Sequence, residues 1–239
     1  MGRAPIRPML LLLPLLLAVP AVAEKGPRKM DLFWKSPEWA AYEPGSIAML
    51  PAATYDGNTA ARHTVENAVA KALREKGYRW TSGLITHDRM MKAGGDSLVK
   101  ALNDQLLKSP RLDSLAAPAY ARMMVANALL TIRVDRYEQY QLEVYQSGKP
   151  STTVGLTMAL VDSSGRLLWS ANGVENAEGI YYTAGSSQLD RNPAALTDRV
   201  TPQGGPPSYV ETLAKLLTRW VPEFPAKMPA PAPTPASAN

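Results

Sequence analysis

The sequence predicts an α/β fold, with a single sandwich domain built on a mixed sheet. Residues 46–51 form a short apolar run that precedes an amphipathic helix and a second short strand, as in a strand–helix–strand unit. Residues 128–173 alternate apolar and polar side chains between tight turns, as in a three-stranded antiparallel meander. Residues 208–221 have the apolar spacing of a closing helix. A length of 239 residues and a hydrophobic fraction of 46% fit one domain with an ordinary core.

The first 23 residues have the three-part pattern of a secretory signal peptide. Arg3 and Arg7 precede an apolar run, and Ala21 and Ala23 place small side chains three and one residues before the expected cut. A transmembrane anchor is the alternative, but the apolar run of about 11 residues is short of the ~20 that a span needs. We therefore expect a mature chain that begins at Glu24 and is periplasmic, with peripheral outer-membrane association or release from the cell left open.

Composition excludes several classes of function. The chain has no cysteine, which excludes disulfides, thiol catalysis, cysteine-ligated metals and a lipid-modified N-terminal cysteine. Removal of the signal peptide lowers the formal net charge from +5 to +3. Because no stripe concentrates the lysines and arginines, we expect no nucleic-acid partner.

Residues 24–44 are an extended lead-in that is rich in aromatic side chains, among them Trp34, Trp39 and Tyr42. Two interpretations stay open. These rings pack the segment onto the domain, or they form a docking site for a partner, since Trp and Tyr are favoured at interface hot spots. Under the second interpretation, deletion of 24–44 weakens partner capture and leaves the fold intact.

The domain proper is predicted over 45–221. After the strand at 46–51, Thr59 is expected to cap a helix that runs to about Lys76, and Gly77 stands where a helix stop is expected. A second strand at 78–82 is then parallel to the first through a right-handed crossover.

The loop between the first strand and this helix contains Asp56, Gly57 and Asn58. In open α/β sheets, ligands often bind at the carboxyl ends of the strands. The loop is therefore a candidate contact for a small ligand or a partner. A plain strand-to-helix connection is the alternative.

Two more helices are predicted before the meander. One covers 86–107 and is interrupted at Gly94-Gly95, and the other covers 114–125. The meander strands are expected at 128–144, with a bulge near 136–139, then at 152–161 and 166–173; these ranges complete the predicted sheet.

The remaining segments are less regular. Residues 181–207 have little periodicity, and a stretch of about 25 such residues is usually functional or disordered. Ser208 is expected to cap the closing helix. The proline- and alanine-rich residues 222–239 are predicted to be a flexible tail outside the core.

Several segments carry a resemblance to a known family. They are 46–51 (Ser-Ile-Ala-Met-Leu-Pro), 73–78 (Leu-Arg-Glu-Lys-Gly-Tyr), 125–134, which echoes an Ala-Asp-Ala element before a strand, the pair Tyr137 and Tyr140, and 160–169, with the pattern Leu-x-Asp-x-x-Gly-x-x-Leu-Trp. Over about residues 45–175 the chain resembles a poorly characterised family of small Gram-negative outer-membrane lipoproteins of the meningococcal surface lipoprotein type. The layout is similar to the fold of the curli-secretion lipoprotein, the penicillin-binding-protein activator lipoprotein and the TolB N-terminal domain.

The resemblance implies an α/β sandwich that recruits other envelope proteins and is not an enzyme. The chain departs from the family at two positions. The family has a lipidated cysteine after its signal, where this chain has Ala23-Glu24, so lipid anchoring is not implied. The central aspartate of the Ala-Asp-Ala element is Asn127 here, which argues against a role that needs a carboxylate at this position.

No catalytic motif stands out. The two histidines, His63 and His87, are 24 residues apart, and their spacing does not predict a metal site. The nucleophile-elbow, phosphate-loop and dinucleotide motifs are absent from the sequence. We therefore expect no catalytic residues, no cofactor and no metal.

Three functions are compatible with these observations. The leading hypothesis is a non-enzymatic periplasmic or cell-envelope accessory protein that binds envelope proteins or assists assembly of an outer-membrane-associated complex. The alternative is a small-ligand or peptidoglycan-associated binding module. The third is an envelope hydrolase, which would need paired carboxylates, but the candidate aspartates are better explained as turn and cap residues.

Overall fold

The computed structural model describes residues 31–143, 146–181 and 205–228. The predicted signal peptide with its cleavage residues Ala21 and Ala23, residues 182–204 of the irregular stretch, and residues 229–239 lie outside the described residues. In the described ranges, no helix has both the length and the hydropathy needed to cross a membrane.

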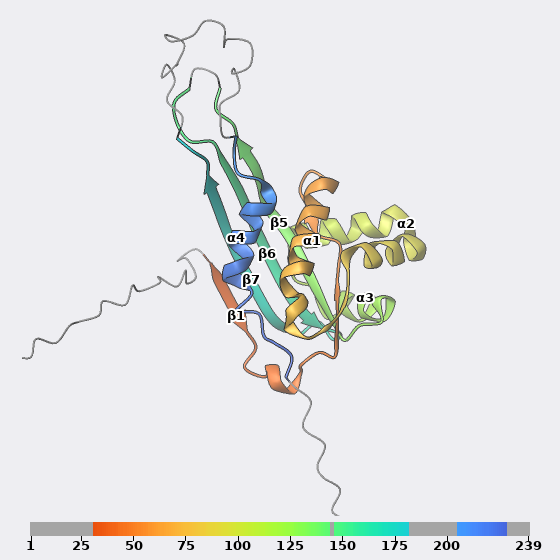
Figure 1. The fold of residues 1–239 in the computed structure, drawn as a ribbon. Coiled ribbons are helices and arrows are strands. Elements are labelled where there is room, and N and C mark those ends of the chain that lie inside the picture. Colours follow the sequence, from red (N-terminus) through yellow and green to blue (C-terminus); the bar gives the residue numbers. More distant parts are fainter. Residues whose placement is uncertain (1–30, 144–145, 182–204, 229–239) are drawn as a thin grey trace, which may run out of the picture.

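The centre of the molecule is a seven-stranded mixed sheet, which confirms the predicted α/β class (Figure 1). The strand order is β1-β7-β6-β5-β2-β4, and β3 pairs with β5 beside this path. The strands are β1 Leu32–Lys35, β2 Ser46–Met49, β3 Ala53–Thr54, β4 Arg79–Thr81, β5 Ala128–Tyr140, β6 Ser151–Asp162 and β7 Leu167–Glu178. The helices are α1 Thr59–Leu73, α2 Gly83–Lys108, α3 Ala116–Met124 and α4 Tyr209–Trp220, with short 3-10 turns η1 Trp39–Ala41 and η2 Arg74–Lys76.

Helices cover the two faces of the sheet unequally. On one face α1 and α4 pack against each other, and α4 packs on β6 and β7, closing a core that includes Ile47, Leu156, Trp169 and Trp220. On the other face α2 and α3 pack on β2, β3 and β5 around a smaller apolar core that contains Leu129. The long strands β5, β6 and β7 extend past the helices at one end (Figure 1).

The predicted strand–helix–strand unit is confirmed. Strands β2 and β4 are parallel and joined through α1. The cap differs from the prediction by one residue, because Asn58 and not Thr59 caps α1, accepting a hydrogen bond from the backbone N–H of Ala61 at 2.9 Å. Gly77 ends the following turn with φ of 82°, a left-handed conformation that suits glycine.

The other predicted helices are also present. Helix α2 begins at Gly83, three residues earlier than expected, and Gly95 interrupts it with φ of 66°, as the Gly-Gly pair predicts. Helix α4 begins after Ser208, whose side chain accepts from the N–H of Glu211 at 3.2 Å, which confirms the predicted cap.

The meander is confirmed, but two strand ends differ from the prediction: β5 ends at Tyr140, short of residue 144, and β7 runs past residue 173. Strand β5 contains a register shift between Val134 and Arg136, close to the predicted bulge. Strand β7 continues to Glu178 and not only to Gly173. The polar residues Glu175 and Asn176 interrupt the apolar pattern, so the sequence did not predict this extension. Glu175 faces the helix-covered side although it is charged, because it pairs there with Arg219 of α4.

The lead-in is part of the domain. Residues 32–35 form β1, the edge strand that pairs with β7 in antiparallel fashion. Trp39 is buried in the core and its ring meets that of Tyr78 edge-on. Asp31 makes a buried ion pair with Arg219. Deletion of 24–44 would therefore remove a strand, a core ring and an ion-pair partner, so the expectation that it leaves the fold intact is wrong.

The start of the predicted tail also belongs to the core. Phe224 is 1% exposed and its ring lies 4.9 Å from that of Trp169. The indole N–H of Trp169 donates to the carbonyl of Glu223 at 3.0 Å, and the N–H of Lys227 donates to the carbonyl of Lys76 at 2.8 Å. The packed domain thus continues to at least Lys227, beyond the boundary predicted at 221.

Candidate functional site

On the side of the sheet opposite α4, the edge formed by β1 and β7 is partly exposed, whereas Thr157 and Ala159 of β6 on the same side are buried. The strand register places residues on this side in rows, because directly paired residues share a face. One row is Arg133, Thr157, Asn172 and Leu32, and the next is Thr131, Ala159, Ser170 and Trp34. We call the surface formed by Leu32, Trp34, Arg133, Asp135, Thr157 and Asn172 the open face.

The apolar part of the open face lies on the edge strand. The side chains of Leu32 and Trp34 are 64% and 44% exposed. Between them Phe33 points to the opposite side, where its ring meets that of Trp220 edge-on at 6.1 Å. Because side chains alternate along a strand, Phe33 anchors β1 to the core, and Leu32 and Trp34 stay on the surface.

The polar part of the open face is a connected network across three strands. Arg133 Nε donates to Asp135 Oδ1 at 2.6 Å, and the hydroxyl of Thr157 donates to Asp135 Oδ2 at 2.5 Å. Asn172 Nδ2 donates to the Thr157 oxygen at 2.5 Å. Asp135 follows Arg133 by two residues on β5, so the alternation of the strand places both side chains on the same face. The network is internally satisfied, so its groups are held in fixed positions.

The structure does not bring the predicted contact residues into one site. Trp34 lies on the open face, whereas Trp39 is buried on the opposite side of the sheet. Tyr42 is 41% exposed and lies under the guanidinium of Arg166, whose central carbon is 3.6 Å from the ring centre.

The predicted loop contact consists of residues that stabilise the turn. Asp56 Oδ1 accepts from the N–H of Asn58 at 3.0 Å, and the Asn58 side chain caps α1. Gly57 has φ of 66°, which the turn requires. The side-chain oxygens of Asp56 and Asn58 are thus engaged within the loop, as the alternative of a plain connection requires, and a ligand role for them stays a prediction.

His63 and His87 lie near enough for the charge of one to act on the other, which their separation of 24 residues in the sequence did not predict. His63 Nδ1 lies 3.9 Å from Glu66 Oε2. Burial raises the pKa of Glu66, although its carboxylate accepts the N–H of Ala52 at 2.9 Å. Burial, followed by the charges of Arg62 and His63, lowers the pKa of His87. Among the described residues, no group of three or more His, Asp or Glu side chains has the arrangement of a metal site.

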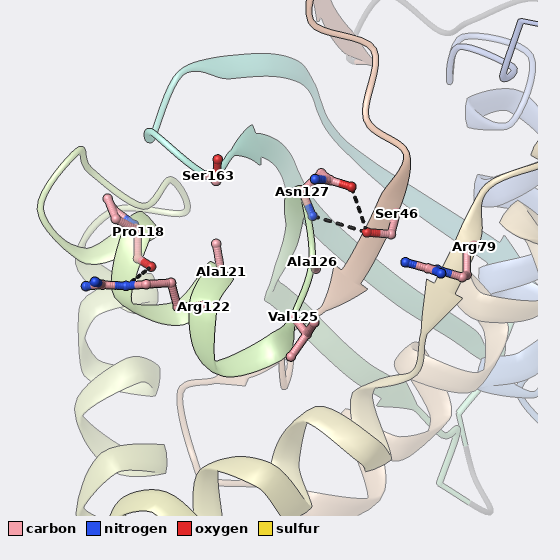
Figure 2. Close-up of a pocket in the computed structure, with 9 residues that line it drawn as sticks. All are labelled: Ser46, Arg79, Pro118, Ala121, Arg122, Val125, Ala126, Asn127 and Ser163. Atoms are coloured by element: carbon pink, nitrogen blue, oxygen red, sulfur yellow. Dashed lines mark hydrogen bonds between the residues drawn. The ribbon is translucent and has the colours of Figure 1, made fainter.

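A pocket of about 660 Å³ lies at the amino ends of β2, β4 and β5 (Figure 2). We call it the Asn127 pocket. Its lining residues are Ser46, Arg79, Pro118, Ala121, Arg122, Val125, Ala126, Asn127 and Ser163. These residues come from four segments that are distant in the sequence, and no local motif joins them, so sequence reasoning missed the pocket.

Val125 in this pocket has a strained backbone. It follows α3 with φ of 52° and ψ of 50°, a left-handed conformation that is rare for a β-branched residue. Its N–H is held by the carbonyls of Ala121 and Arg122, and its side chain is 75% exposed.

We expect Val125→Gly to raise the free energy of unfolding by about 1 kcal/mol, because the left-handed conformation costs roughly 1–2 kcal/mol in an L-residue and little side-chain burial is lost. Urea denaturation measures the change. Val125→Ala is the matched control, because it keeps the Cβ and so leaves most of the strain in place. Equal stability of the glycine and alanine variants would show that the backbone is not strained.

Comparisons with known proteins find likeness in solved structures alone. No protein-family model matches the chain, and no curated protein matches it. The chain is similar to PelC from Paraburkholderia phytofirmans, solved as a dodecamer, with 19% identity, 83% of this chain and 99% of that chain covered, and a TM-score of 0.42. It is similar to lipoprotein GNA1162 from Neisseria meningitidis, with 19% identity, 66% and 98% coverage and a TM-score of 0.43. It is also similar to hypothetical protein CT253 from Chlamydia trachomatis, with 14% identity, 74% and 94% coverage and a TM-score of 0.39.

Membership of the lipoprotein family that the sequence resembles therefore stays a prediction. The function has to be argued from the contacts of this chain itself.

Proposed function

We propose that this protein is a non-enzymatic accessory protein of the cell envelope, and that it binds another envelope protein through the open face. The observation that carries the proposal is the exposure of Leu32 and Trp34 beside a preorganised polar network on a rigid sheet. Large apolar side chains on a monomer surface that have polar neighbours are typical of protein interaction sites.

The partner that fits this surface is a folded protein surface of mixed character. Trp34 and Leu32 need an apolar counterpart, because their burial would make the main favourable contribution to the free energy of binding. Arg133 and Asp135 already neutralise each other at 2.6 Å, so a partner is not required to supply a compensating charge. A neutral donor or acceptor is sufficient opposite Asn172, because Thr157 is buried and its hydroxyl already bonds to Asp135 and Asn172.

The envelope location rests on the predicted signal peptide and on the resemblance of residues 45–175 to envelope lipoproteins. Because the sequence has no cysteine, a lipidated cysteine is not available, and binding to such a partner is one way to hold the protein at a membrane.

The test is a comparison of captured partners between variants matched in chemistry. We expect Leu32→Ser and Trp34→Ala to lose a partner that the tagged wild-type protein captures after in-cell crosslinking. An interface hot spot of this kind typically costs at least about 2 kcal/mol when truncated, or roughly a thirtyfold loss of affinity. Leu84→Ser is the control, because Leu84 on α2 is 66% exposed, close to the 64% of Leu32.

If both open-face variants still capture the same partner, the open face is not the binding site. The same conclusion follows if Leu84→Ser loses the partner to the same extent. Sedimentation with purified sacculi separates the alternative, since a peptidoglycan-associated module pellets with the cell wall and an adaptor does not.

A further inference from the structure

The Asn127 pocket contains positive charge that no carboxylate of the described chain neutralises. Arg79 begins β4 and Arg122 lies in the last turn of α3, and both are exposed. Neither makes an ion pair within the described residues. Arg122 donates from Nε to the carbonyl of Pro118 at 3.3 Å and lies along the rim of the pocket (Figure 2).

The carboxylates that neighbour the pocket residues along the chain are engaged elsewhere. Asp162, next to Ser163, accepts from the N–H groups of Ser164 and Arg166 at 2.8 and 2.9 Å. Glu43 accepts from the hydroxyl of Tyr78 and from the N–H of Met228. These groups stabilise turns and the C-terminal segment and do not pair with the arginines of the pocket.

The carbonyl end of α3, which carries the negative end of the helix dipole, is also compensated. Val125 and Ala126 donate their N–H groups to the last carbonyls of the helix, and Arg89 donates to the carbonyl of Met124. The negative potential of that end is thereby reduced near the pocket.

Asn127 supplies a neutral donor in a fixed orientation. The hydroxyl of Ser46 donates to Asn127 Oδ1 at 3.0 Å, and the N–H of Asn127 donates to the Ser46 oxygen at 3.2 Å. This pair directs the amide nitrogen away from Ser46 (Figure 2). Because an aspartate here would bring a negative charge next to Arg79, asparagine keeps the pocket suited to an anion.

We propose that the Asn127 pocket binds an oxyanion, the phosphate or carboxylate group of a small polar ligand. Arg79 is the charged contact, because a guanidinium matches both groups with two parallel hydrogen bonds. Asn127 Nδ2 and Ser163 lie on the other side of the Ser46–Asn127 pair from Arg79 (Figure 2), and they are the neutral donors for the rest of the ligand. The apolar side chains of Ala121 and Val125 bound the pocket, and a volume of about 660 Å³ accommodates a small molecule.

The experiment is an NMR titration of the mature chain with inorganic phosphate, glucuronate and glucose. We expect the amide signals of Asn127 and Ser163 to shift and saturate at millimolar phosphate or glucuronate, and not with glucose. Arg79→Gln should weaken the binding at least about tenfold, since it removes a charge-assisted hydrogen bond. Arg74→Gln is the matched control, because Arg74 is an exposed arginine outside the pocket.

Saturation by phosphate alone assigns the pocket to phosphate ligands, and saturation by glucuronate alone assigns it to acidic sugars. The proposal is overturned if neither anion shifts these signals, if glucose shifts them equally, or if Arg79→Gln with a wild-type spectrum elsewhere binds as tightly as Arg74→Gln. The result is independent of the open face, because Leu32 and Trp34 are not part of the pocket.

Discussion

Arg219→Met is expected to lower the free energy of unfolding by about 3–5 kcal/mol, which is the usual cost of removing one partner from a buried ion cluster. Arg219 Nε donates to Asp31 Oδ2 at 2.7 Å, and its Nη1 donates to Glu175. The side chains of all three residues are at most 6% exposed. The variant removes the guanidinium that Asp31, just before β1, and Glu175 of β7 share with α4, so both buried carboxylates lose this counter-charge.

The packing around this cluster makes rearrangement difficult. Gly173 lies so close that a Cβ at this position would come within 2.2 Å of Asp31 Oδ1. Lys215→Met on the same helix is the control, since the pair of Lys215 with Glu211 is exposed and worth less than about 0.5 kcal/mol. Urea denaturation of the two variants compares them directly. A loss below about 1 kcal/mol for Arg219→Met would mean that the cluster is not buried as described.

Truncation after Val221 is expected to cost at least about 3–5 kcal/mol, the range for loss of a buried phenylalanine. It removes Phe224, whose ring contacts those of Trp169, Tyr78 and Trp80. It also leaves the buried indole of Trp169 without the carbonyl of Glu223.

Truncation after Met228 is the matched control, because it removes the proline- and alanine-rich end and keeps Phe224. We expect its midpoint of urea denaturation to equal that of the full mature chain. Similar stability of both truncated chains would contradict the packing of 222–228 and restore the boundary at 221.

Sequence patterns predicted the elements that depend on local spacing. The buried run of β2, the helix face of α1 and the stop at Gly77 follow from side chains that are neighbours in sequence. The Gly-Gly break in α2 and the Ser208 cap of α4 were predicted for the same reason, because each depends on a few adjacent residues.

The elements that the sequence did not predict depend on distant contacts. Strand β1 has four residues and pairs with residues 169–172, so its own sequence carries little strand signal. The end of β7 was missed because Glu175 faces inward to meet Arg219, which a hydrophobic pattern cannot anticipate. Phe224 stands between Pro222 and Pro225 in a stretch with the composition of a linker, although its ring packs against Trp169.

The candidate sites were only partly predicted, because they too depend on contacts between segments that are distant in the sequence. Trp34 was identified from aromatic density, and the structure places it on the open face. The polar network of Arg133, Asp135 and Thr157 needs the register of β5 with β6, which the sequence alone does not fix. The Asn127 pocket needs the parallel arrangement of β2, β4 and β5, which brings Arg79 and Ser46 to the same edge.

Site-specific photo-crosslinking in living cells tests the central proposal most directly. A photoreactive residue is placed at position 34 or 172 on the open face, and at Lys71, an exposed position of α1, as the control. We predict that positions 34 and 172 give an adduct with the same envelope protein and that position 71 does not. A folded, exported protein that gives no adduct from the open face, or the same adducts from position 71, would contradict the proposal that this face binds a partner.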